Sequence, residues 1–599
     1  MKTRIFQIII LFVLCVAGAA AQEPQSFRSL SLGGIIYDDL DLVFDPIELQ
    51  FVDSLRLYTN LSNTSLKAFT SSANGTSASN EYLLGVSRIN PLVDNLWTAV
   101  LLRFEKSKVP NSLSLSPDLT GYNFLDGEGE LQSEYTEYLD QNGNDLYDLK
   151  RSISQKQSSF NDNDAYSFVL NNSYIFDNYT LGFKLTLGNY SYEGNQANGY
   201  YGSGHGYLQG SYWNSPSFSR SVDEFYIDSG YSRLQWGERG DYSSKYESPY
   251  LRLAASAMRT ISEYEVRADV GYYTIDDKNK TDDAYHGSQE LFNPRSPTYE
   301  NTYVEDETNK SGSSKEGGAL AVGGSVRYVF DQQIERKNDG YVFLGANMTF
   351  ESFDYTYSWK NNSSRVETVN DGVAGPLNDF TQEQTGYSGT NDDGTGTSNL
   401  FYATLRANKP LSDDVYFGIG ASFSISSLKR ETKYTNESNY SNRYTKIDNA
   451  TDWYDYLSTE TGSMNANRTY KTYSTFLSLP VAVEYRFSED MKWKLRLGSV
   501  FQYLTSTIDD AMQVTDSKPY TTKTERGDGT AALNINDNKY YSQSEHSNSK
   551  ETRTYLTYGI GFDPTHNIQI DAIGFFDVDK HTDLESYLQN FMLAIVFKL

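Results

Sequence analysis

Apolar and polar positions alternate along much of the chain from about residue 160 onward. In the range 263–275, Tyr264, Val266 and Val270 lie on one face of an extended strand, and charged or small residues lie on the other. The same period of two predicts further strands. They are expected at 165–176, 179–190, 251–257, 317–330, 341–357, 399–409, 415–428, 477–487, 492–503, 553–562 and 568–578, with weaker ones at 97–106, 207–213 and 224–236.

The connections between these strands are of two kinds that alternate along the chain. Short turns rich in Pro, Asp, Asn and Ser are expected at 177–178, 261–262, 410–414, 488–491 and 563–567. Long polar stretches occupy 191–221, 277–316, 358–398, 429–471 and 508–551. This alternation predicts an all-β fold, a transmembrane antiparallel up-and-down β-barrel with short periplasmic turns and long external loops. We expect about 14 strands, in a range of 12 to 16, because such barrels have an even number.

Pro480 interrupts one of these predicted strands, 477–487. Proline has no N–H to donate to a neighbouring strand, and a closed barrel has no edge strand to accommodate it. The sequence therefore predicts a β-bulge at this position.

The two ends of the chain add an expected domain order. Residues 1–21 combine a basic start, an apolar run and Ala19-Ala20-Ala21, which is the layout of a signal peptide. Residues 22–80 lack the strand rhythm and carry Asp45 and Glu48 among apolar residues, so they are expected to form a periplasmic or plug segment, or else the first hairpin of the barrel. The barrel is expected to occupy 81–599 and to end in an alternating strand at 588–599.

Composition excludes several classes of protein. After the predicted signal peptide, no apolar run approaches the roughly 20 residues that a membrane helix needs. The formal net charge of −27 makes nucleic acid a poor partner. The single cysteine, Cys15, lies in the predicted signal peptide, so no disulfide is expected in the mature chain. Aromatic residues make up 14% of the chain, a content that suits the aromatic girdles of a membrane barrel.

Together, the signal peptide, the ladder of strands and the final strand Asn590–Leu599 resemble bacterial outer-membrane β-barrel proteins as a class. The resemblance implies location in a Gram-negative outer membrane, contact with its lipid, and recognition by the barrel-insertion machinery. The class usually ends in an aromatic residue, whereas this chain ends in Leu599. Size and a possible plug also resemble the fourteen-stranded long-chain fatty-acid and hydrocarbon transporters, although no motif of that group is present.

The candidate functional residues are charged side chains on the predicted inner faces. Both signs occur there, so they would either screen solutes in a hydrated lumen or pair with one another and fill it. These candidates are Arg252, Glu265, Arg267, Asp269, Arg327, Arg406, Glu484, Arg486, Lys494 and Arg496, with Lys184 and Asp571 beside them.

Two other kinds of site have weaker support. Asp140, Asn142, Asn144 and Asp148 place oxygen ligands at nearly alternate positions, as a calcium loop does, but Arg151 stands where the closing Glu would be. An ordinary polar loop is the favoured interpretation, and calcium is the only cofactor that the sequence suggests. Catalysis is not expected, because the five histidines are widely spaced and no nucleophile elbow occurs.

Two functions remain open from the sequence. The first is an outer-membrane channel or transporter that passes small solutes or hydrophobic molecules. The second is a non-transporting barrel that displays long acidic loops for adhesion or for binding an envelope partner. The solute and the oligomeric state are not specified by the sequence.

Overall fold

A computed structural model provides the fold. The residues it describes are 39–52, 55–61, 78–90, 93–110, 122–125, 130–139, 149–158, 160–194, 217–226, 233–293, 299–332, 339–371, 380–412, 414–446, 456–487, 492–536, 542–565, 568–577 and 591–598. Two short helices occur among them, α3 (Asp39–Phe44) and the 3₁₀ helix η1 (Glu48–Phe51). Neither of these described helices is long and apolar enough to cross a bilayer. All other elements in the described ranges are β-strands.

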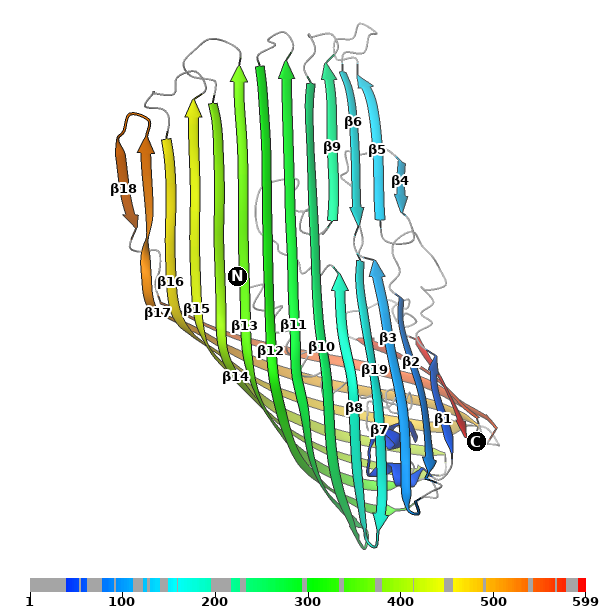
Figure 1. Cartoon of the computed structure of the whole chain (residues 1–599). Coiled ribbons are helices and arrows are strands. Elements are labelled where there is room, and N and C mark those ends of the chain that lie inside the picture. Colours follow the sequence, from blue (N-terminus) through cyan, green and yellow to red (C-terminus); the bar gives the residue numbers. More distant parts are fainter. Residues whose placement is uncertain are drawn as a thin grey trace.

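Antiparallel pairing joins sixteen of the strands into a ring, because β1 pairs with β2 on one side and with β21 on the other (Figure 1). Around the ring lie β1 (Arg56–Leu61), β2 (Ala78–Ile89), β3 (Leu96–Pro110), β7 (Phe160–Phe176), β8 (Tyr179–Gly194), β10 (Arg233–Ile261), β11 (Tyr264–Asn293), β12 (Tyr299–Asp331), β13 (Gly340–Asp371), β14 (Phe380–Ser412), β15 (Val415–Lys446), β16 (Tyr456–Phe487), β17 (Trp493–Arg526), β19 (Gln543–Thr565), β20 (Ile568–Asp577) and β21 (Phe591–Lys598).

The strands from β10 to β17 are far longer than a bilayer requires. β13 has 32 residues, which at about 3.3 Å per residue is an extended length of about 105 Å. A tilted strand crosses the hydrocarbon region with only about 9–11 residues. Each long strand therefore has one part that matches a membrane and a longer part that projects beyond it.

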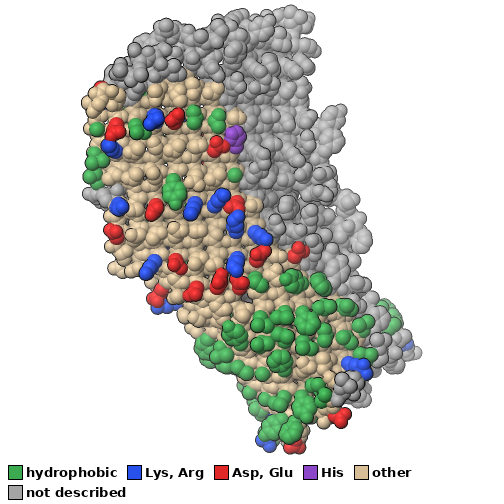
Figure 2. Space-filling view, in the orientation of Figure 1, with side chains coloured by type: hydrophobic (Ala, Val, Ile, Leu, Met, Phe, Trp, Pro, Cys, Tyr) green, Lys and Arg blue, Asp and Glu red, His purple; other side chains and the backbone are tan. Residues whose placement is uncertain are grey.

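Side-chain type changes sharply along these strands, as Figure 2 shows: apolar side chains cover the lower part of the wall, and rows of charged residues cross the upper part. The apolar band is solvent-exposed rather than packed against protein. On its outer surface lie, among others, Leu181, Phe183, Leu253, Val266, Val270, Leu344, Met348, Leu405, Ile419, Leu497 and Ile560. A ring of strands with such a band facing outward has the surface of a barrel that spans a membrane.

Above the apolar band, five shorter strands extend the wall. β9 (Ser217–Tyr226) pairs with the upper part of β10, β6 (Leu149–Ser158) with β9, β5 (Glu130–Leu139) with β6, and β4 (Tyr122–Leu125) with β5. At the other side β18 (Ala531–Asn536) pairs with β17. The described pairings in this upper part run from β4 to β18 and do not return to their start, so only the lower part is a ring.

The predicted all-β antiparallel barrel is confirmed, and the described turns at 177–178 and 262–263 lie within one residue of predicted ones. Asp177 and Ser262 both adopt a φ of 55°, in the left-handed region that tight reversals between adjacent strands require. The ring has sixteen strands, the upper limit of the predicted range rather than 14. The difference arises partly because β1 and β2, both beginning within 22–80, are strands of the ring.

The prediction of long external loops was wrong for four of the five stretches. Strands occupy most of 277–316, 358–398, 429–471 and 508–551, and β8 also continues into the fifth stretch as far as Gly194. The reason is physical: beyond the membrane both faces of a strand carry Ser, Thr, Asn and Gly, so the apolar alternation that reveals a strand disappears.

The bulge predicted at Pro480 was also wrong. The register between β15 and β16 is the same on both sides of the proline, with Ile419 opposite Val481 and Ser422 opposite Ser478. Pairing is absent between them, and a Cβ built on Gly420 would lie 3.2 Å from the ring of Pro480. The missing N–H therefore opens the ladder locally without inserting a residue.

Candidate functional site: the inner wall and the segment inside the barrel

Residues 39–52, here called the plug segment, lie inside the lower end of the ring (Figure 1). Their apolar side chains form the core of the molecule. Leu42, Val43 and Leu49 are at most 4% exposed and pack against inner-face residues of β1, β2, β3 and β7, including Leu101 and Val169. The plug segment is thus seated on the wall by hydrophobic burial, the dominant favourable term in protein packing.

Polar groups of the wall bind the carbonyl oxygens that end helix α3. Asn171 Nδ2 on β7 donates to the oxygen of Val43 at 2.7 Å, and Lys184 Nζ on β8 donates to the oxygen of Phe44 at 3.0 Å. The last carbonyls of a helix have no partner within it, and their partial negative charge favours a cation. The wall therefore supplies the cap that the plug segment lacks.

Asp45 has two functions at once. Its Oδ1 accepts hydrogen bonds from the backbone N–H groups of Ile47 at 2.8 Å and Glu48 at 3.3 Å, which caps the start of η1. Its Oδ2 accepts from Arg267 Nη1 of β11 at 2.6 Å. Arg267 is held in turn by Asp269, whose Oδ1 lies 2.6 Å from Arg267 Nε. One carboxylate thus fixes both the local turn of the plug segment and its attachment to the wall.

Arg327 on β12 lies among three carboxylates. It is 3.7 Å from Glu48 of the plug segment, 3.9 Å from Glu265 of β11 and 3.6 Å from Asp339, and its guanidinium stacks over the Tyr341 ring at 4.1 Å. These ion-pair distances are longer than a hydrogen bond, so the attraction is electrostatic and not geometrically fixed. This attraction attaches the plug segment to the wall at a second place, with less fixed geometry than the Asp45–Arg267 hydrogen bond.

A glycine allows the plug segment to approach β8. A Cβ built on Gly182 would lie 2.9 Å from Pro46 Cβ and 3.0 Å from its carbonyl carbon. No side chain fits in that space unless Pro46 moves. Gly182 is therefore required by the close approach of the two backbones.

On the other half of the ring, Arg496 of β17 is the centre of a fully buried ionic cluster. Its Nε donates to Glu484 Oε2 of β16 at 2.9 Å, and its Nη1 donates to Asp571 Oδ1 of β20 at 2.6 Å. Gln569 Nε2 donates to the second oxygen of Asp571 at 2.6 Å, and Arg486 lies 3.5 Å from Glu484. Arg496 and Glu484 are 0% exposed. This cluster cross-links three strands of the ring.

The other sequence candidates also lie on the inner wall. Lys494 pairs with Asp563 at 2.8 Å. The guanidinium of Arg252 lies over the rings of Tyr250 and Tyr273 at 4.9 and 5.7 Å, and that of Arg406 lies 5.6 Å from the Phe343 ring. The lumen candidates are thus paired with each other, with aromatic rings or with the plug segment, and their role in selectivity stays a prediction.

The predicted calcium ligands Asp140, Asn142, Asn144 and Asp148 lie outside the described residues. Among the residues that are described, no group of three or more His, Cys, Asp or Glu side chains is arranged to hold a metal ion. The site that the structure does define is an ionic and hydrophobic seat for residues 39–52. Asp45, Glu48, Arg267 and Arg327 stand out in the sequence by their charge. Asn171, Gly182, Asp339 and Gln569 were missed, because they carry no charge pattern or lie in a connection. Thr180 was missed for the same reason, although its Oγ1 donates to Gln50 Oε1 of the plug segment at 3.0 Å.

The comparisons with known proteins concern fold only. No family model and no curated protein matches the chain. Solved structures that match include the alcaligin outer-membrane receptor FauA from Bordetella pertussis, with a TM-score of 0.23, 8% identity, and coverage of 91% of this chain and 76% of that one. A mutant ferric enterobactin receptor PfeA from Pseudomonas aeruginosa matches with a TM-score of 0.25 and 9% identity, covering 91% of this chain and 80% of that one. The ferric yersiniabactin uptake receptor FyuA from Yersinia pestis matches with a TM-score of 0.22 and 10% identity, covering 91% of this chain and 79% of that one. At these scores the likeness carries no argument about cargo.

Proposed function

We propose that this chain is a non-enzymatic outer-membrane transport protein whose lumen is narrowed at the turn end by its own plug segment. The observation that carries the proposal is the seat of that segment inside the ring, made by Asp45–Arg267, by the capped helix end at Asn171 and Lys184, and by the apolar contacts of Leu42 and Val43. Cargo would pass when this seat is released.

The inner wall favours a polar cargo over a hydrophobic one. The described charged side chains of the inner wall include Glu265, Asp269, Glu484 and Arg496. The apolar part of the inner wall is covered by the plug segment. Charged walls order water and select solutes by charge. The hydrophobic cargo implied by the fatty-acid transporter resemblance has no supporting observation in this wall.

The second candidate is display of a long outer wall for adhesion or for an envelope partner. The length of the polar strands favours it, since β10 to β17 continue well past the part that a membrane covers. Under this alternative the plug segment only stabilises the barrel, and its release changes no permeability.

Conductance across a planar bilayer separates the two. We compare the full-length protein with the double variant Asp45→Asn/Glu48→Gln, which removes both charges that the plug segment offers to Arg267 and Arg327 while keeping side-chain size. Gly182→Leu provides an independent disturbance, because its side chain must displace Pro46. Gly271→Ala is the control, as a Cβ there meets nothing closer than 3.4 Å.

The transport proposal expects low conductance for the wild type and for Gly271→Ala, and a clear increase for both plug variants. Equally low conductance in all four proteins, with folded barrels shown by circular dichroism, would overturn transport and support display. A large steady conductance in the wild type would contradict the narrowing.

A further inference from the structure

The ladder between β10 and β11 is interrupted at the upper border of the apolar band. Pairing stops at Glu247 opposite Lys278 and resumes at Arg252 opposite Tyr273, with the register unchanged. Pro249 lies in this interval and has no N–H to donate. Ladder pairing between β10 and β11 is therefore absent between residues 248–251 and 274–277.

Side chains replace the missing backbone pairing on both faces. The N–H of Leu251 donates to Thr274 Oγ1 at 3.0 Å, and Ser248 Oγ donates to Asp277 Oδ1 at 2.6 Å. The interval is a seam in the barrel wall, defined here as residues 248–251 and 274–277.

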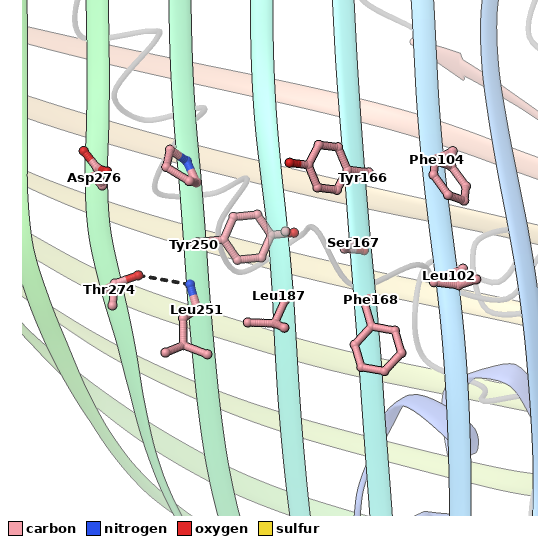
Figure 3. Close-up of a pocket in the computed structure, with 12 residues that line it drawn as sticks. Leu102, Phe104, Tyr166, Ser167, Phe168, Leu187, Tyr250, Leu251, Thr274 and Asp276 are labelled. Atoms are coloured by element: carbon pink, nitrogen blue, oxygen red, sulfur yellow. Dashed lines mark hydrogen bonds between the residues drawn. The ribbon is translucent and has the colours of Figure 1, made fainter.

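A pocket of about 550 Å³ lies against this seam. It is within the size range of ligand sites, roughly 300–1,000 Å³. Figure 3 shows its lining from β3 to β11, with aromatic and aliphatic side chains on β3, β7, β8 and β10 and with Asp276 of β11 at its upper edge. Phe104, Tyr166 and Leu187 are 52%, 53% and 44% exposed, which places the pocket on the outer, lipid-facing side of the wall.

The charged rim of the pocket lies directly above its apolar floor. Lys278 is 2.9 Å from Asp276, and Lys245 and Lys280 lie opposite each other on β10 and β11. The side chains of these three lysines are 52%, 54% and 71% exposed, so their ammonium groups reach solvent although each also contacts a carboxylate. Lys278 also lies 3.8 Å from Glu316, so the rim carries both signs of charge. An occupant that fits both regions has an apolar chain and a polar head that offers an anionic group to the exposed lysines.

We propose that the seam pocket is a specific binding site for a membrane lipid, an acylated amphiphile with phosphate in its head group. The acyl chain lies against Phe104, Phe168 and Leu187 on the outer faces of β3, β7 and β8. The phosphate lies at Lys278. The proposal rests on the outer-membrane location but not on the plug segment or on transport.

Photo-crosslinking in nanodiscs tests this site. Two tracers with a diazirine in the acyl chain, a diacyl phospholipid and a lipid A analogue, distinguish the two sources of the same chemistry. Labelling is mapped by mass spectrometry at the peptide with Leu251 and at the peptide with Leu497, an equally apolar position on β17 that lies outside the pocket. At least one tracer is expected to label the first peptide about fivefold more, equivalent to ~1 kcal/mol of preference.

Three variants make the result specific. Leu187→Trp fills the pocket and is expected to remove the preference, whereas Leu181→Trp, on the same strand and face and 49% exposed, leaves it unchanged. Lys278→Gln is expected to reduce labelling by both phosphate tracers and to spare a diacylglycerol tracer without phosphate.

Equal labelling of the two peptides would overturn the site while leaving the membrane location intact, because both peptides would then contact only bulk lipid. Labelling of neither peptide would overturn the location and the site together. Labelling that persists in Leu187→Trp, or that is unaffected by Lys278→Gln, would contradict the proposed position of the chain or of the phosphate.

Discussion

Replacing Arg496 with methionine tests the ionic cluster of β16, β17 and β20 most directly. The substitution keeps an unbranched apolar stem but removes the charge and both of the hydrogen bonds that reach Glu484 and Asp571. Both carboxylates are then left buried without their principal cation, since their side chains are 0% and 3% exposed.

The expected cost follows from those two contacts. A hydrogen bond to a charged group contributes about 1.5–3 kcal/mol, and breaking a buried ion pair on one side costs about 3–5 kcal/mol. Asp571 keeps its bond from Gln569 at 2.6 Å, and Glu484 keeps Arg486 at 3.5 Å, so the lower part of that range applies. We therefore expect Arg496→Met to lower the free energy of unfolding by about 3 kcal/mol.

Urea unfolding in lipid vesicles, followed by tryptophan fluorescence, measures this difference. Arg496→Lys is expected to lose less, because it keeps the charge but cannot present a planar fork to two carboxylates at once. Glu247→Gln, which breaks the exposed pair with Lys245, is the control and should change stability by less than about 1 kcal/mol. A loss for Arg496→Met no larger than that of the control would refute the cluster as a cross-link of the barrel.

Two further predictions concern the polar part of the wall. Gly396→Ala is expected to destabilise the protein by about 1–3 kcal/mol, because the new Cβ would lie 2.4 Å from the Phe353 ring; Gly312→Ala, with 3.4 Å to its nearest atom, should be nearly neutral in the same unfolding assay. The pKa of Asp528 is lowered from its ordinary value of 3.8, because its carboxylate accepts hydrogen bonds from the Thr530 hydroxyl and backbone N–H. The ionised carboxylate therefore stabilises the turn between β17 and β18 above pH 3.8. This stabilisation is lost as the pH falls through the lowered pKa. The amide proton of Thr530 should report this acid transition by NMR, and Asp528→Asn should abolish it.

The apolar part of each strand was predictable because one face meets lipid and the other does not. Val266 and Val270 alternate with Arg267 and Asp269 for this reason, and the alternation by itself assigns the charged residues to the inner wall. The turn at Asp177 was likewise visible from its residue type.

The polar part of the wall was not predictable by the same rule. From Lys360 to Ser364 on β13 both faces of the strand are polar, so the period of two that defines a strand in the sequence is absent. Such stretches have the composition of loops, and only their pairing with neighbouring strands shows otherwise.

The seat of the plug segment was beyond sequence reasoning for a different reason. Asp45 and Arg267 are separated by 222 positions, and nothing in either neighbourhood specifies the other. The role of Gly182 is equally hidden, because a required close approach is a property of two segments and not of one.

Each long strand is one continuous element, embedded in lipid below and exposed to water above. A single-cysteine scan along the outward-facing positions of β13 measures this directly, with one water-soluble and one lipid-soluble maleimide applied to the protein in vesicles. Cysteines replacing Leu344, Met348 and Phe350 are expected to react only with the lipid-soluble reagent, and those replacing Asp354 and Ser358 with the water-soluble one. Reaction of all five positions with the water-soluble reagent would show that the apolar part of β13 is not embedded in lipid.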